Sequence, residues 1–219
     1  MAFENVVLPT YSKTEEILNS VSHGIGVVLG VVFLILGIQK STVANNVVAA
    51  IVFGIATIVL YSCSTLYHSL KAGTAKKAMR LIDHSAIFIM ITGTATAINI
   101  ISVYPFNKVF SVSVAALSIG LSLLGIVLTF IDQEKYMKVQ MRLYIVVGFA
   151  SGLLAIPIFK YHEVDMLTLF LVVFGGVMYM VGMALYKVGK KKKYFHSIFH
   201  LFVIAGTCLH FGAIYMYLS

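Results

Sequence analysis

The chain has 219 residues, of which 60% are hydrophobic and only 11% charged, and its mean hydropathy is +0.97. A soluble domain carries about 25% charged residues, so this composition excludes an ordinary water-soluble globule. A bilayer-spanning helix needs about 20 mostly apolar residues, so the length allows roughly seven or eight spans. We therefore interpret the formal net charge of +8 first as a record of membrane topology, and expect no nucleic-acid partner.

Seven apolar segments, bounded by polar or charged breaks, run along the chain. In chain order, we expect membrane-spanning helices at residues 19–38, 46–68, 81–103, 109–131, 143–159, 166–186 and 194–218. The apolar runs do not alternate with polar residues as β-barrel strands would. The predicted fold is therefore all-α: one seven-helix bundle over residues 1–219. Two pairs of small residues at helical spacing, Gly26 with Gly30 and Gly148 with Gly152, predict close helix packing.

The positive charges divide unevenly between the two sides of a seven-span chain. The N-terminal segment and the second, fourth and sixth loops hold 13 of the 16 Lys and Arg residues. The other side holds only Lys40, Lys108 and Lys160. Because cytoplasmic loops are enriched in Lys and Arg, we predict a cytoplasmic N-terminus and an extracellular C-terminus. The first twenty residues have no apolar core, so we expect no cleaved signal peptide.

Ionisable side chains gather at the predicted cytoplasmic face. Charged or titratable groups at membrane depth are costly and are candidates for function. Asp83 and five of the seven histidines lie near span ends on this face, and these histidines are His23, His68, His84, His196 and His200. His210 lies deeper in the last span, where we expect a packing or hydrogen-bonding role.

The spacing of these residues favours a metal site. His196 and His200 are four residues apart, so on a helix both imidazoles project from one face. Ser64 and His68 repeat this spacing in the second segment. A further polar stripe opens the first segment and consists of Glu16, Asn19 and His23.

The functional interpretation is a catalytic zinc held by His68, His196 and His200. Three neutral imidazoles leave a fourth position for water, whose pKa zinc lowers to about 7. In this interpretation Asp83 orients or deprotonates the water, and Ser64 binds it or stabilises a developing oxyanion. The remaining polar residues would support the ligands or bind polar groups of a substrate, and they are Glu16, Asn19, His23 and His84.

The alternative is that these polar residues only tie helix ends together or flank the membrane where water reaches them. Interfacial histidines cost little free energy, and an isolated pair at i, i+4 arises easily by chance. Spacing alone leaves both interpretations open.

The ordered set of motifs resembles the hemolysin III family. The matching residues are Glu16, Asn19 and His23, then Ser64 and His68, then Asp83 and His84, and finally His196 and His200, with the string FHSIFHLF at 195–202. This family is the bacterial branch of the progestin and adipoQ receptor superfamily, which is related to the adiponectin receptors and is similar to alkaline ceramidases. The resemblance covers essentially the whole chain.

The resemblance implies a zinc site near the cytoplasmic face of a multi-pass protein of the bacterial cell membrane. It implies zinc ligands at His68, His196 and His200, with Ser64 and Asp83 close to the metal. The expected function is hydrolysis of ceramide-like lipid amides, or of lipid esters, in membrane homeostasis, with membrane lipids as partners. The other expectation from the family is a hemolysin that forms pores or perturbs membranes and has a structural metal.

Overall fold

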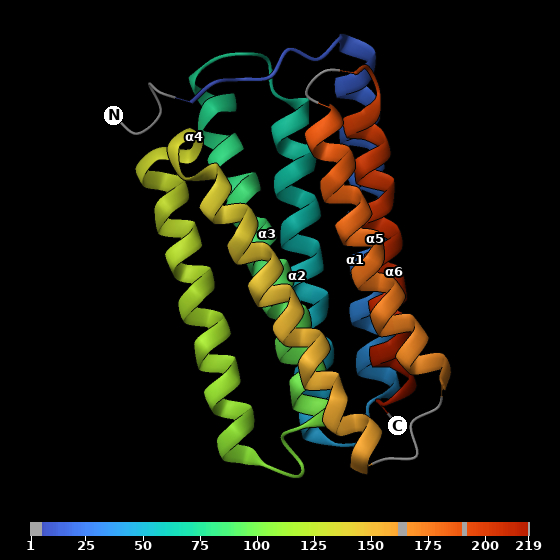
Figure 1. Ribbon diagram of the computed structural model, residues 1–219. Coiled ribbons are helices and arrows are strands. Elements are labelled where there is room, and N and C mark those ends of the chain that lie inside the picture. The colour runs from blue at the N-terminus through green and yellow to red at the C-terminus, as the bar shows by residue number, and fades with distance from the viewer. Residues whose placement is uncertain (1–5, 162–165, 190–191, 219) are drawn as a thin grey trace.

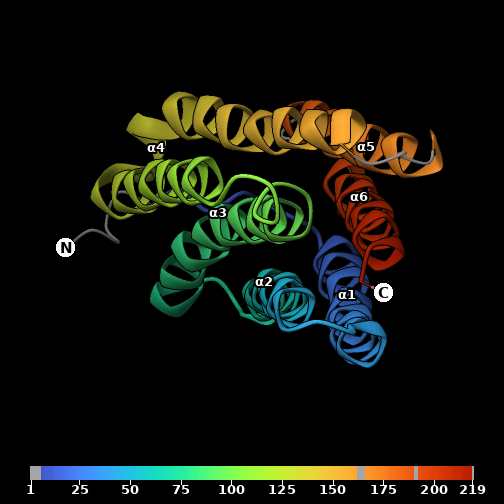
Figure 2. The same cartoon turned by 90° about the horizontal axis from the view of Figure 1, so that it is seen from below.

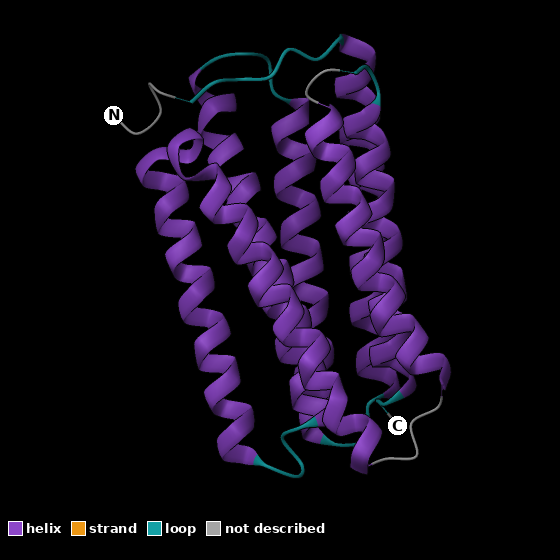
Figure 3. Ribbon diagram, viewed as in Figure 1, coloured by secondary structure: helices purple, strands orange, loops and turns teal. Residues whose placement is uncertain are grey.

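The computed structural model describes the backbone of residues 6–161, 166–189 and 192–218, and their side chains apart from 150–161 and 188–189. All regular structure in this part of the chain is α-helical (Figure 3). The helices are α1 (Lys13–Lys40), α2 (Ala44–Ser69), α3 (Thr74–Ser102), α4 (Lys108–Tyr161), α5 (Met166–Gly189) and α6 (Phe195–Met216).

The helices form a bundle in which chain neighbours pack together (Figures 1 and 2). α1 contacts both α2 and α6, so the first and last helices of the chain lie side by side. α2 packs on α3, α3 on α4, and α5 on α6. Helices α1 and α6 begin at the same end of the bundle, and α2 ends there, at Ser69. We call this end of the bundle the "site end".

The sequence predicts two separate spans where the structure has the single element α4. Six helices in the described part are long and apolar enough to cross a membrane, and not the predicted seven. The predicted loop between residues 131 and 143 is wrong, because helix continues on both sides of Asp132, the one residue with non-helical dihedrals (φ −164°, ψ 98°). Glu, Lys, Gln and Met dominate residues 133–141 and are good helix formers. Figure 1 shows the chain reversing direction at this break, near the site end.

Several helices begin earlier than the apolar pattern predicts. α1 begins at Lys13 instead of residue 19, and α3 at Thr74 instead of residue 81. A capping box explains the start of α1: Ser12 Oγ accepts a hydrogen bond from the Glu15 amide, and the Glu15 carboxylate accepts one from the Ser12 amide. The charged first turns are helical although they are too polar to count as membrane segments.

The burial pattern is that of a membrane protein. Large apolar side chains cover the outside, and Val109, Leu117 and Phe149 are 78%, 62% and 67% exposed. Polar side chains such as Thr57 and Thr207 are fully buried between helices. A continuous apolar surface is incompatible with water, whereas buried hydroxyls and amides tie helices together in lipid. The chain is therefore a multi-pass membrane protein.

Close contact between α1 and α2 confirms the prediction for Gly26 and Gly30. A Cβ atom at Gly26 would lie 2.5 Å from the Tyr61 ring, and one at Gly30 would lie 2.9 Å from the Ile58 side chain. A Cβ at Gly148 would make only an ordinary contact, 3.9 Å from Ile91, so the close packing predicted for Gly148 is not seen. The surroundings of Gly152 lie outside the described side chains.

Candidate metal centre

Three histidines meet at the site end of the bundle. His68 comes from the last turn of α2, while His196 and His200 come from the first turns of α6. The Nε2 atom of His196 lies 3.2 Å from Nε2 of His68 and 3.2 Å from Nε2 of His200. All three rings are buried, and a nitrogen from each lies within 4.8 Å of the others. These side chains could hold a metal ion.

Hydrogen bonds on the far side of two rings determine which nitrogen is available to a metal. His68 Nδ1 lies 2.7 Å from Glu16 Oε2, and His200 Nδ1 lies 3.2 Å from the backbone oxygen of Asn19. A carboxylate and a carbonyl only accept hydrogen bonds, so each Nδ1 carries the proton. In the neutral rings, the Nε2 atoms of His68 and His200 then each present a lone pair toward Nε2 of His196. That nitrogen carries at most one proton, so it can donate to only one of the two lone pairs.

This arrangement fits a metal better than it fits three hydrogen-bonded imidazoles. Two lone pairs facing one ring nitrogen cannot both be satisfied without a cation between them. Zinc–nitrogen bonds of about 2.0–2.1 Å at tetrahedral angles separate two ligand nitrogens by about 3.3 Å. The separations of 3.2 Å on both sides of His196 match that value.

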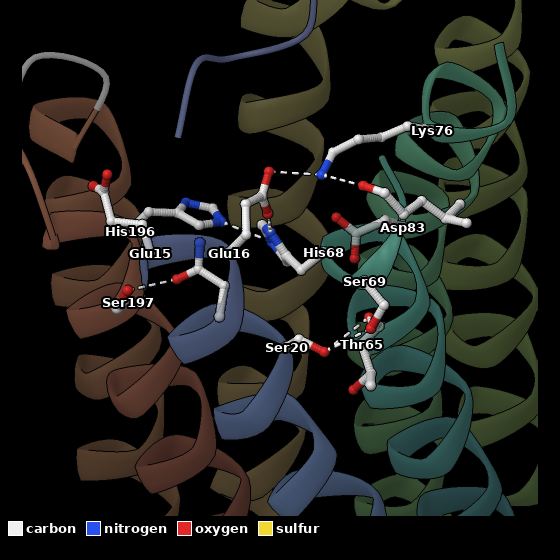
Figure 4. A network of polar contacts seen from close by, with 12 residues as sticks. Glu15, Glu16, Ser20, Thr65, His68, Ser69, Lys76, Asp83, His196 and Ser197 are labelled. Carbon is white, nitrogen blue, oxygen red and sulfur yellow. Dashed lines mark hydrogen bonds and ion pairs between the residues drawn. The ribbon is translucent and has the colours of Figure 1, made fainter. Parts of the chain in front are cut away.

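Glu16 connects the candidate ligand His68 to a buried lysine. Its Oε2 accepts from His68, and its Oε1 lies 2.6 Å from Lys76 Nζ, which also donates to the Leu70 carbonyl (Figure 4). A carboxylate that holds the outer nitrogen of a ligating histidine fixes the ring and raises its basicity. Lys76 is only 4% exposed, and sequence reasoning missed it because it lies in a basic segment that looks like a membrane flank.

Asn19 and His23 lie against the same cluster. Asn19 Oδ1 accepts a hydrogen bond of 2.6 Å from Ser197, while its amide nitrogen has no partner in the structure. The ring of His23 stacks on that of His200 with centroids 3.5 Å apart, and both of its nitrogens are buried without partners. The structure thus leaves polar atoms of two predicted site residues available beside the histidine cluster.

Ser64, Asp83 and His84 lie on the α2–α3 side of the centre. Ser64 is buried and hydrogen-bonds the Asp83 carboxylate, which points toward His68 in Figure 4. The Nδ1 of His84 donates to the Arg80 carbonyl and lies 3.7 Å from Asp83 Oδ2, and its Nε2 lies 3.4 Å from the Tyr186 hydroxyl. Asp83 therefore interacts with both Ser64 and His68, and His84 lies close enough to His196 to interact with it electrostatically.

The segment before α1 contributes one residue that the sequence did not reveal. Tyr11 stacks on His196, with ring centroids 5.0 Å apart. Burial raises the pKa of Tyr11 above its ordinary value, so its hydroxyl is neutral near pH 7. No motif marks this tyrosine, because it lies in an irregular segment and approaches the site only in the folded chain.

His210 lies deeper in the bundle, as predicted, and is separate from the metal centre. Its Nε2 donates to the Val172 carbonyl at 3.0 Å, which ties α6 to α5. Nearby, Thr207 joins three helices: it donates to the Val203 carbonyl and is 2.7 Å and 2.8 Å from the hydroxyls of Tyr61 and Tyr179.

Comparisons with known proteins agree with this architecture. A family model described as "Haemolysin-III related" matches residues 11–211. "Hemolysin-3" of Bacillus cereus is 31% identical over 218 residues, which are 98% of this chain and 96% of that protein. "Hemolysin-3 homolog" of Bacillus subtilis (strain 168) is 31% identical and covers 94% of this chain and 96% of its own.

A more distant similarity extends to animals. The human "Monocyte to macrophage differentiation factor" is 23% identical over 177 residues, which are 78% of this chain and 71% of that protein. The match over nearly the full length of two bacterial relatives shows that this multi-pass bacterial membrane protein belongs to the haemolysin-III-related family.

Proposed function

We propose that the protein is a zinc-dependent hydrolase that cleaves an amide or ester bond of a membrane lipid and thereby takes part in membrane homeostasis. The observation that carries the proposal is the convergence of His68, His196 and His200 with the Ser64–Asp83 pair beside them. The pair supplies a carboxylate beside the candidate ligands that could accept a proton from water.

The chain's own residues would divide the chemistry as follows. A zinc ion bound by the three imidazoles would polarise the scissile carbonyl and lower the pKa of water to about 7. Asp83 would accept a proton from the attacking water and return it to the leaving amine or alcohol. Ser64, which donates to Asp83, would hold the carboxylate in position. Asn19 and His23 would bind polar groups of the substrate through their unpartnered nitrogens.

We also propose seven membrane crossings with a cytoplasmic N-terminus and an extracellular C-terminus. The two arms of α4 run in opposite directions from Asp132 and contain about 24 and 29 residues, or about 36 and 43 Å of helix. Each arm is longer than the bilayer core of about 30 Å. If both cross, the N-terminal segment and the second, fourth and sixth loops of the sequence, which hold 13 of the 16 basic residues, lie in the cytoplasm.

The test of the hydrolase is turnover of fluorescent ceramide and phospholipid substrates by purified protein in lipid nanodiscs. Asp83→Asn should abolish turnover while zinc remains bound, and His210→Asn should retain turnover because it lies outside the centre. Turnover by D83N equal to that of the unmodified protein would refute the assigned role of Asp83.

The names of the bacterial relatives support a second candidate, a protein that permeabilises membranes and uses the metal for structure. Dye release from liposomes separates the two proposals. Release that is unchanged in a His196→Ala/His200→Ala variant, together with no lipid turnover, would favour permeabilisation over hydrolysis.

A further inference from the structure

A second candidate binding site lies at the site end, outside the three-histidine cluster. It is a cavity of about 480 Å³ between the segment before α1 and the ends of several helices. Its volume falls within the range of about 300–1,000 Å³ typical of small-molecule sites. Thr10 and Tyr11 line one wall, and Arg80, Tyr186 and the two lysines Lys192 and Lys193 line the others.

The acidic groups of this cavity are already engaged. Glu15 accepts hydrogen bonds from Ser12 through one carboxylate oxygen and from the Tyr194 amide, at 2.9 Å, through the other. Glu134 accepts a bond of 3.2 Å from Arg80, so that buried guanidinium is paired as well.

Two lysines supply exposed ammonium groups to the cavity. Lys192 and Lys193 are exposed and line it, and Lys193 also interacts electrostatically with the Glu15 carboxylate. Lys192 Nζ lies 5.5 Å from the centre of the Phe195 ring, which holds it near the start of α6. Two ammonium groups beside a half-apolar cavity match an anion attached to an apolar body.

Two tyrosines separate the cavity from the metal centre. Tyr11 and Tyr186 line the cavity, and their ring centroids lie 5.0 Å and 5.7 Å from that of His196. A lipid bound here would be at the level where headgroups meet the basic end of the bundle. The neighbouring residues Val7, Leu8 and Pro9 supply an apolar wall for the acyl-chain end of such a molecule.

We infer that this cavity binds a phosphate group, presented as the headgroup of an anionic membrane phospholipid, between Lys192, Lys193 and the wall formed by Thr10 and Tyr11. Binding of a phosphate group in this cavity requires neither a bound metal nor hydrolysis. A protein without hydrolase activity would therefore still bind the lipid here.

The experiment measures lipid binding by the full-length protein. Purified protein is incorporated in phosphatidylcholine nanodiscs with and without phosphatidylglycerol, and retained lipid is counted by native mass spectrometry across a titration. Lys192→Gln/Lys193→Gln should weaken phosphatidylglycerol binding about tenfold or more, because each basic residue contributes about 1 kcal/mol near an anionic surface. Lys135→Gln/Lys138→Gln removes the same charge near the same end but outside the cavity, and should change binding less than twofold.

A second variant tests the cavity without changing charge. Thr10→Trp places a large ring in the space and should reduce phosphatidylglycerol binding as strongly as the loss of both lysines. Binding unchanged in T10W, or equal losses in the two lysine variants, would overturn the site in favour of general surface attraction. Competition by glycerol 3-phosphate without retention of phosphatidylglycerol would overturn the lipid as the source of the phosphate.

Discussion

At the residue scale, the candidate metal centre depends on side chains that do not touch a metal themselves. Glu16 holds His68 on one side and Lys76 on the other, at 2.7 Å and 2.6 Å. This carboxylate accepts from Nδ1 of the buried ring and so leaves Nε2 to face the other two candidate ligands.

Glu16→Gln should lower zinc affinity by about 10- to 100-fold, the range found when such outer partners are changed. The amide can still accept from His68 Nδ1, but it lacks the charge that raises the ring's basicity and the ion pair with Lys76. Competition with a zinc-binding fluorescent chelator measures the affinity. Glu134→Gln is the matched control, since Glu134 pairs with Arg80 away from the three histidines; an equal loss in both variants would contradict the role of Glu16.

Thr207 provides a second residue-scale prediction, concerning stability. Its hydroxyl proton goes to Val203, so Tyr61 and Tyr179 must both donate to it. Thr207→Val keeps the shape but leaves two buried hydroxyls without an acceptor, at a cost of about 1–3 kcal/mol each. Thermal unfolding in detergent should show a clear fall in Tm for T207V and a much smaller one for Thr207→Ser. Equal Tm values for the valine variant and the unmodified protein would exclude this bonding pattern.

The sequence predicts the residues with a motif and misses those without one. The i, i+4 spacing of His196 and His200 brings the pair to one helix face, and His68, which the sequence also predicts as a ligand, lies beside them in the structure. Lys76 and Tyr11 were not predicted, because a basic flanking segment and an irregular N-terminal segment carry no periodic signal. Their contacts arise from tertiary packing alone.

At the element scale, glycines determine where helices come close. Gly125 of α4 faces the fully buried ring of Phe88 in α3, and an added Cβ would overlap that ring. The ring cannot move freely, because Tyr144 packs against it with centroids 4.3 Å apart. Gly120 lies on the same helix with nothing within 4 Å of an added Cβ.

Gly125→Ala should therefore destabilise the bundle by about 1–3 kcal/mol through overpacking, despite the better helix propensity of alanine. Gly120→Ala should be neutral or slightly stabilising. Unfolding of both variants in the same detergent compares them directly, and a G125A protein as stable as G120A would show that α4 does not pack on α3 as described.

Element boundaries were predicted less well than element positions. Apolar windows locate the centres of the helices, but charged turns at Lys13 and Thr74 extend two of them. The region around Asp132 was predicted as a loop because it is polar, whereas its residues favour helix and only one of them departs from helical dihedrals. The hydropathy pattern indicates which residues contact lipid, whereas the extent of a helix also depends on helix propensity and capping.

At the scale of the whole molecule, the proposed topology predicts a labelling pattern. In a chain with Cys63 and Cys208 replaced by alanine, single cysteines at Lys71, Asn107 and Lys135 probe both ends of the bundle and the break in α4. In intact bacteria, a membrane-impermeant maleimide should label only the cysteine at position 107. All three should react once the cells are opened.

Labelling of positions 107 and 135 together from outside would mean that α4 does not cross the membrane twice. Labelling of position 71 from outside would reverse the orientation and place the metal centre on the extracellular side.

The measurement that tests the central claim most directly is the zinc content of the purified protein. Inductively coupled plasma mass spectrometry should find about one zinc per chain in the unmodified protein and in His210→Ala, whose ring is buried elsewhere in the bundle. The His196→Ala/His200→Ala variant should contain almost none while remaining helical by circular dichroism. Stoichiometric zinc that survives in the folded double variant, or its absence from the unmodified protein purified without chelator, would contradict the three-histidine metal centre.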